Sequence, residues 1–146
     1  MKLFIDTSVI LAAAGSEKGA SRYVFEHATV HGWSLLSIRY CLEEAQRNAL
    51  KVGRKVPATL DESMVPKLAL VPMELAFDKA LVFSRSKDRP VLISALGAYA
   101  DHLLTLDEGD FQEIVPSGGE LIDGWRPHGE SNRRLPNNRK ASLSVS

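Results

Sequence analysis

The sequence predicts an α/β domain in three layers, with a central parallel sheet flanked by helices. Short, fully apolar runs such as residues 3–5 are typical of strands buried on both faces of a sheet. Longer segments with helical spacing of their apolar residues lie between these runs, and alternation of strands with helices produces a parallel sheet. The 146 residues are enough for one such domain with its own hydrophobic core.

The order of elements follows from these patterns. Strands are expected at residues 3–5, 33–36, 68–71 and 102–106, with a last strand at 113–115 or 121–122. Helices are expected at residues 9–14, 20–31, 38–50 and 74–83, and from residue 88 onward. Polar side chains that can cap a helix support three of the starts: Thr7 or Ser8, then Ser37, and then Asp88, which Pro90 follows in the first turn.

Three details of this order can be checked against a structure. The helix at residues 38–50 should bury a stripe made of Ile38, Cys41, Leu42, Ala45 and Ala49. The helix after Asp88 should bury Leu92, Ala95, Leu96 and Tyr99. Residues 51–66 contain Gly53, Pro57 and Pro66, which interrupt regular structure, so we predict a loop there that holds at most a short strand or turn.

Composition narrows the class of protein. With 45% hydrophobic and 25% charged residues, the chain resembles an ordinary globular domain. No apolar run approaches the roughly 18 residues of a membrane span, and the N-terminal apolar stretch is broken at Asp6, so we expect neither a membrane helix nor a signal peptide. The single cysteine, Cys41, excludes a disulfide within the monomer and suits a reducing cytoplasm.

The distribution of charge divides the chain into two parts. Eighteen basic and eighteen acidic residues cancel, which is a mild argument against nucleic-acid binding. Residues 126–146 carry five Lys or Arg and one acid, Glu130, so the remainder is net acidic. We therefore predict a domain at residues 1–125 and a basic tail at residues 126–146 that is disordered or becomes ordered with a partner. An acidic domain that binds RNA needs divalent metal to offset its own carboxylates.

Acidic residues follow the predicted strands or begin the predicted helices. Asp6 and Asp107 each stand at the carboxyl end of a strand, where parallel sheets place their sites. Asp88 begins a helix, and Glu43 and Glu44 lie on the helix at residues 38–50. At about 100° per residue, Glu44 flanks the apolar stripe and Glu43 points further to the solvent, so we favour Glu44. Converging carboxylates suit Mg²⁺, and paired metal ions activate a water and stabilise a leaving oxygen in phosphodiester hydrolysis.

Four segments resemble the motifs of the PIN-domain nuclease family, in the expected order. They read LFIDTSV at residues 3–9, LEEAQRN at 42–48, DRPVLISAL at 88–96 and ADHLLTLDEGDF at 100–111. The second motif has its acid before a small apolar residue, which again selects Glu44. The resemblance spans roughly residues 2–123; residues 53–87 and the basic tail match no motif of the family.

The resemblance implies a three-layer PIN-like fold and a Mg²⁺- or Mn²⁺-dependent endoribonuclease. Its catalytic and metal-binding residues would be Asp6, Glu44, Asp88 and Asp107. Such proteins are often VapC-like toxins of bacterial toxin–antitoxin pairs, which commonly form homodimers and are inhibited by an antitoxin protein that covers the acidic cleft.

Several of these residues also have structural interpretations. Asp6 and Asp88 could act as helix caps, and Asp107 and Asp110 could be turn residues, with Asp110 otherwise a ligand of a second metal. Ser8 and Thr105 could line the cleft or serve as a cap and a strand hydroxyl. Asp101 precedes its strand, at the wrong end for the site, and is expected to be structural. Cys41 is expected in the core.

Three other functions compete with a ribonuclease. A PIN-like fold without catalysis would be an RNA- or protein-binding module, and metal titration separates the two. A phosphatase with Asp6 as nucleophile normally needs a second acid two residues later, where this chain has Ser8. His27 and His31 have the i, i+4 spacing of a zinc pair, but no third ligand is evident nearby.

Overall fold

A mostly parallel sheet forms the centre of the protein. The computed structural model describes residues 1–74, 89–106 and 142–143, and within them the strand order is β3-β2-β1-β4-β5. The strands are β1 (Lys2–Ile5), β2 (Ser34–Ile38), β3 (Leu68–Val71), β4 (His102–Thr105) and β5 (Ser142–Leu143). Strands β1 to β4 run parallel, and β5 pairs antiparallel with β4. The predicted strands at residues 3–5, 33–36, 68–71 and 102–106 are confirmed within two residues at each end.

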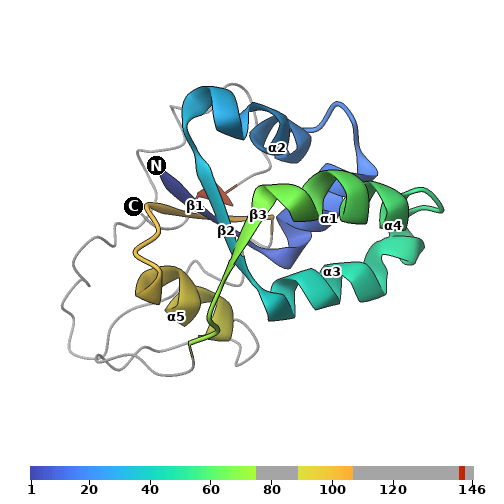
Figure 1. Cartoon of the computed structure of the whole chain (residues 1–146). Coiled ribbons are helices and arrows are strands. Elements are labelled where there is room, and N and C mark those ends of the chain that lie inside the picture. The colour runs from blue at the N-terminus through green and yellow to red at the C-terminus, as the bar shows by residue number, and fades with distance from the viewer. Residues whose placement is uncertain (75–88, 107–141, 144–146) are drawn as a thin grey trace.

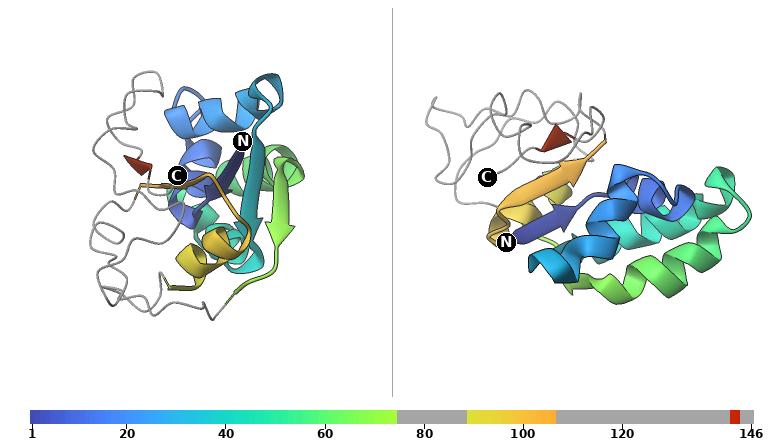
Figure 2. Two further views of the ribbon diagram at one scale, coloured as in Figure 1. Left: turned by 90° about the vertical axis from the view of Figure 1, so that its left-hand side faces the viewer. Right: turned by 90° about the horizontal axis from the view of Figure 1, so that it is seen from above.

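Helices cover both faces of this sheet, as the predicted three-layer α/β class requires. They are α1 (Thr7–Gly15), α2 (Ala20–His31), α3 (Arg39–Val52), α4 (Val56–Thr59) and α5 (Arg89–Gly97), with a π turn η1 (Leu60–Met64) and a 3₁₀ turn η2 (Val65–Lys67). Figures 1 and 2 show α5 on the opposite side of the sheet from α1 and α3. None of the described helices is long and apolar enough to cross a membrane.

The direction of the connections explains this division. From β1 to β2 to β3 the chain moves one way across the sheet, and it then returns past β1 to reach β4. Parallel crossovers are right-handed, so connections that run in opposite directions place their helices on opposite faces. The order of strands therefore reverses between β1 and β4.

The core is built on the central strands. Leu3, Phe4 and Ile5 of β1 are all buried, as expected for a strand covered on both faces. Helices on both sides add the side chains that pack against them; the largest are Ile10, Phe25, Leu60, Met64 and Leu92.

Helix α2 has the bounds that the sequence predicts. It spans Ala20–His31 and ends at Gly32, whose backbone has the left-handed conformation with φ of 65°. The Gly32 N–H donates to the carbonyl of Thr29. Only glycine takes this conformation without strain, which is why the glycine marks the end of the helix.

The prediction of a loop at residues 51–66 is wrong. Helix α3 continues to Val52, and α4, η1 and η2 then carry the chain to β3. Pro57 and Pro66 lie in the first turns of α4 and η2, where a missing N–H costs nothing. The side chains of Leu60 and Met64 are buried in the hydrophobic core, which fixes this segment against the rest of the domain. The prolines begin turns of helix here instead of interrupting them.

Two predicted caps are also wrong. Helix α1 starts at Thr7, so Asp6, and neither Thr7 nor Ser8, occupies its cap position. Helix α3 starts at Arg39 after Ile38, and Ser37 is a fully buried residue of β2. The Ser37 hydroxyl donates to the carbonyl of Ile5 at 2.8 Å. This tertiary hydrogen bond takes the Ser37 side chain away from the start of α3.

The predicted stripe of the helix after Asp88 is confirmed in part. Leu92 and Ala95 are buried, and Leu96 packs partly buried against the core. Tyr99 is 83% exposed, because α5 ends at Gly97 and Tyr99 itself has a positive φ of 53°. That backbone turn swings its side chain off the helical stripe.

Other predicted elements lie outside the described residues. These are most of the helix at residues 74–83, the last strand at 113–115 or 121–122, and residues 126–141 and 144–146 of the predicted tail. Two residues of that tail form β5, beside β4.

The hydrogen bond from the Ser37 side chain of β2 to the Ile5 carbonyl of β1 gives a first prediction. Ser37→Ala should lower the free energy of unfolding by about 1 kcal/mol, because it removes a buried hydrogen bond to the carbonyl of Ile5. Chemical denaturation measures the change. Ser34→Ala is the matched control, since Ser34 is an exposed residue of the same strand. Equal stability of the two variants would contradict the role of the Ser37 hydroxyl.

Candidate active site

The candidate site lies where the strand order reverses. Strands β1 and β4 are neighbours, and α1, which follows β1, lies on the opposite face of the sheet from α5, which precedes β4. Such a reversal of strand order opens a crevice at the carboxyl ends of the strands in α/β proteins. Asp6 follows the last residue of β1, and Thr105 is the last residue of β4. The Asp6 N–H donates to the carbonyl of Leu104 at 3.1 Å, which fixes the start of α1 against β4.

Two hydroxyl groups hold the Asp6 carboxylate. Ser8 Oγ and Thr105 Oγ1 each donate to Asp6 Oδ2 at 2.9 Å, and the two hydroxyl oxygens lie 3.4 Å apart. The backbone N–H of Leu106 donates to Ser8 Oγ at 3.0 Å. Asp6 is only 8% exposed. Its side chain makes no capping bond to α1, so the helix-cap interpretation does not describe what the carboxylate does.

Glu44 comes to the same place from α3. Its carboxylate oxygen Oε2 accepts a hydrogen bond from Thr7 Oγ1 at 2.8 Å, and Thr7 is the residue directly after Asp6. Glu44 is half-buried, whereas Glu43 is exposed. The structure thus places the two glutamates as the helical spacing predicts, with Glu44 on the side of α3 that faces the start of α1.

Cys41 lies beneath this pair of acids, as expected of a core residue. It is fully buried, and its Sγ is 4.0 Å from Asp6 Oδ1. Burial, and then the negative charge of Asp6, raise the pKa of the Cys41 thiol to about 12. The side chain is therefore a neutral thiol at physiological pH. It supplies a weak hydrogen-bond donor and no thiolate ligand.

The atoms gathered here are hard oxygen donors. Carboxylates of Asp6 and Glu44 stand with the hydroxyl groups of Ser8, Thr7 and Thr105. Mg²⁺ and Mn²⁺ prefer such oxygen ligands, so the donor set fits either ion. In the part of the chain that the structure describes, no three His, Cys, Asp or Glu side chains form a metal-binding group.

Two of the four predicted ligands are brought together, and two lie outside the described residues. The first pair is Asp6 and Glu44, linked through Thr7. Asp88 falls within residues 75–88, and Asp107 and Asp110 fall within residues 107–141. Leu106, the residue before Asp107, lies in the described part of the chain. Because Thr105 bonds to Asp6, the chain leaves β4 at the candidate site.

Asp101 has the structural role that the sequence predicts. Its carboxylate oxygen Oδ2 accepts a hydrogen bond from the N–H of Lys2 at 2.6 Å, and its own N–H donates to the Lys2 carbonyl. These bonds fasten the start of β4 to the start of β1. Asp101 thus lies at the end of the sheet away from Asp6.

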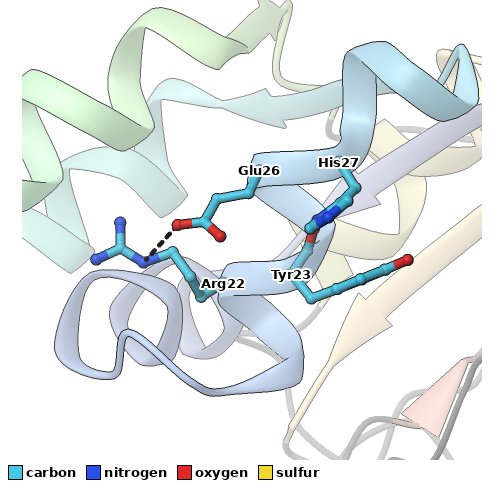
Figure 3. Close-up of polar contacts among 4 residues, drawn as sticks. All are labelled: Arg22, Tyr23, Glu26 and His27. Carbon is cyan, nitrogen blue, oxygen red and sulfur yellow. Dashed lines mark hydrogen bonds and ion pairs between the residues drawn. The ribbon is translucent and has the colours of Figure 1, made fainter.

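The histidines of α2 are engaged in ring stacking. The rings of Tyr23 and His27 stack with centroids 3.9 Å apart, and His27 Nδ1 lies 3.0 Å from the Tyr23 carbonyl (Figure 3). His31 stacks on Trp33 at 4.5 Å. Among the described residues no third ligand joins these histidines. The stacking gives them a structural explanation that needs no zinc.

Thr7 is the residue of this site that sequence analysis treated only as a helix cap. Its hydroxyl is the link between α1 and Glu44. The sequence does indicate that Thr7 lies near the site, because it directly follows the acid at the end of β1. The partner on α3 could not be identified without the packing of α1 on α3.

Comparison with known proteins adds no family assignment to this geometry. The resemblance to PIN domains therefore depends on the four sequence motifs alone. No protein-family model, no curated protein and no solved structure matches the chain.

Proposed function

We propose that the protein is a metal-dependent endoribonuclease that hydrolyses phosphodiester bonds in RNA. The observation that carries the proposal is the buried Asp6 carboxylate at the reversal of strand order, with Glu44 bound to the hydroxyl of the next residue, Thr7. A carboxylate buried at the carboxyl ends of parallel strands lies where α/β proteins place their sites, and the hydroxyl and carboxylate oxygens near it suit a divalent ion. Mg²⁺ or Mn²⁺ would be held by Asp6 and Glu44 together with Asp88 and Asp107.

The chain's own residues prepare this site for a cation and a phosphate. Ser8 and Thr105 orient the Asp6 carboxylate, and Thr7 orients that of Glu44. A bound divalent ion supplies the Lewis acid that activates water and stabilises the leaving oxygen. It also offsets the negative charge that would otherwise repel the RNA backbone, which matters because the domain is net acidic.

The direct test is cleavage of a labelled RNA by the purified full chain. Cleavage is expected with Mg²⁺ or Mn²⁺, should stop with a chelator and should return when the metal is restored. A contaminating metal-independent ribonuclease would continue in the chelator. Metal binding and RNA binding without cleavage would replace the proposal with the inactive, RNA-binding module. Absence of metal binding would contradict the proposed metal-dependent nuclease function.

The two glutamates of α3 provide a matched pair of variants. Glu44→Gln should reduce cleavage at least about tenfold more than Glu43→Gln, because outer partners of metal sites alone are worth 10–100-fold and Glu44 is proposed as a ligand. Both changes remove one charge from the same helix and keep the side-chain volume. Initial rates at saturating Mn²⁺ measure the difference. The opposite order would show that Glu43 is the ligand.

The resemblance also supplies a biological setting for this activity. We place the reaction in the cytoplasm, where Cys41 would remain reduced. There the protein would act as the toxin of a toxin–antitoxin pair, as a homodimer, with an antitoxin covering the acidic cleft. Co-purification with a small protein encoded beside it, and loss of cleavage in that complex, would test the assignment.

A further inference from the structure

The Thr7 hydroxyl lies between two oxygen atoms of α3. Thr7 Oγ1 is 2.8 Å from Glu44 Oε2 and 3.3 Å from the carbonyl oxygen of Cys41. Thr7 is only 8% exposed, and it directly follows Asp6. Residues 6–7 therefore provide both the first acid, Asp6, and the hydroxyl that donates a hydrogen bond to the second acid, Glu44.

A threonine hydroxyl has one proton for these two acceptors. The Cys41 carbonyl lies within α3, where helical geometry already gives it the N–H of Ala45 four residues later. The Glu44 carboxylate is closer and carries a negative charge, so it forms the stronger hydrogen bond. The proton of Thr7 is thus directed to Glu44.

Glu44 needs such a donor to stay where it is. A glutamate on a helix surface has three rotatable side-chain bonds, and a hydrogen bond that fixes its carboxylate must offset the loss of this freedom. Thr7 itself has little freedom, because its branched side chain is buried in the first turn of α1. A rigid donor therefore favours one position of the Glu44 carboxylate.

We propose that Thr7 is a positioning residue that holds the Glu44 carboxylate ready to bind the metal ion. The inference rests on the proposed metal-dependent function. It adds that Thr7, which is not a proposed ligand itself, holds the ligand Glu44 in position. It predicts that the affinity for metal, and not only the stability of the fold, depends on the Thr7 hydroxyl.

The test compares Thr7→Val, which keeps the shape and removes the hydroxyl, with Thr7→Ser, which keeps the hydroxyl. The Mn²⁺ concentration at half-maximal cleavage should rise about 10–100-fold in Thr7→Val, the range known for outer partners of metal ligands. Thr7→Ser should restore it to near the wild-type value. The Mn²⁺ concentration that gives half of the full melting shift should change in parallel, which provides a readout independent of activity.

A purely structural role would give a different pattern. Thr7→Val would then melt lower, but its Mn²⁺ midpoints would equal those of the wild type, and that result would overturn the inference. In a Glu44→Ala background, which removes the acceptor of the hydroxyl, Thr7→Val should cause no further change in the midpoint. A further rise there would equally count against the role. If Thr7→Val does not fold, Thr7→Ala, a good helix former of smaller volume, replaces it in the same measurements.

The same experiment separates this inference from the proposed function. A wild-type protein without any Mn²⁺-dependent melting shift or cleavage would overturn both. A wild-type protein that responds to Mn²⁺, with Thr7→Val and Thr7→Ala responding at the same concentrations, would overturn the role of Thr7 alone.

Discussion

Asp6→Asn is expected to abolish RNA cleavage. The loss should exceed the roughly 100-fold that removal of an outer partner of a metal site can cost, because a proposed ligand itself loses its charge. The fold should survive, since one oxygen of the asparagine amide can still accept from Ser8 and Thr105. Initial rates at saturating Mn²⁺ measure the loss, and circular dichroism with thermal melting verifies the fold.

Asp101→Asn is the matched control for this experiment. It also removes one carboxylate charge next to the sheet, but at the end occupied by Lys2 and away from Asp6. Its cleavage rate should equal that of the wild type. Wild-type activity of Asp6→Asn in the presence of Mg²⁺ would eliminate the proposed site.

Mn²⁺ is expected to raise the melting temperature of the wild type by several degrees. An ion that binds only the folded state stabilises it by about 2.7 kcal/mol at 100 times its dissociation constant. For a domain near this size, each kcal/mol corresponds to roughly 2–4 °C. The repulsion among Asp6, Glu44, Asp88 and Asp107 should destabilise the protein without metal. Asp6→Asn/Asp107→Asn should therefore melt higher than the wild type without metal and respond weakly to it.

The control for this second experiment removes two acids outside the site. Asp61→Asn/Asp101→Asn changes the net charge equally, and Asp61 in the structure accepts a bond from Gln46 that asparagine can keep. This variant should retain the full Mn²⁺ response. A wild type indifferent to millimolar Mn²⁺, together with no gain of stability in Asp6→Asn/Asp107→Asn, would mean that the four carboxylates do not share a site.

Periodicity and apolar runs were enough to predict most of the fold. Helix α2 ends where Gly32 predicts, and apolar runs locate β1, β3 and β4, although β3 at the sheet edge is only partly buried. The errors arose where a residue's effect depends on tertiary contacts. Proline can begin a helix as well as interrupt one, and at Pro57 the packing of the following turns decides between these roles. The Ser37 hydroxyl likewise could not be assigned to Ile5 without knowledge of the sheet.

The candidate site was predictable to the level of single acids and no further. The position after a strand selects Asp6, and helical spacing selects Glu44 over Glu43. The network that holds them was not predictable, because Thr105 and Asp6 are 99 positions apart, and Thr7 and Glu44 are 37 apart. Asp88 and Asp107 remain predictions from sequence motifs.

The bond from Thr105 to Asp6 has a consequence for the timing of folding. A pairing across 99 positions forms slowly, because much of the chain must become ordered before its ends can meet. During synthesis, Asp6 leaves the ribosome early, but its partner in β4 follows only after most of the domain has been made. A nascent chain would therefore carry all of α1 and α3 while its first acid still lacked the Thr105 hydroxyl. Asp6 therefore gains the Thr105 hydroxyl, one of the two that hold its carboxylate, only after β4 has been made.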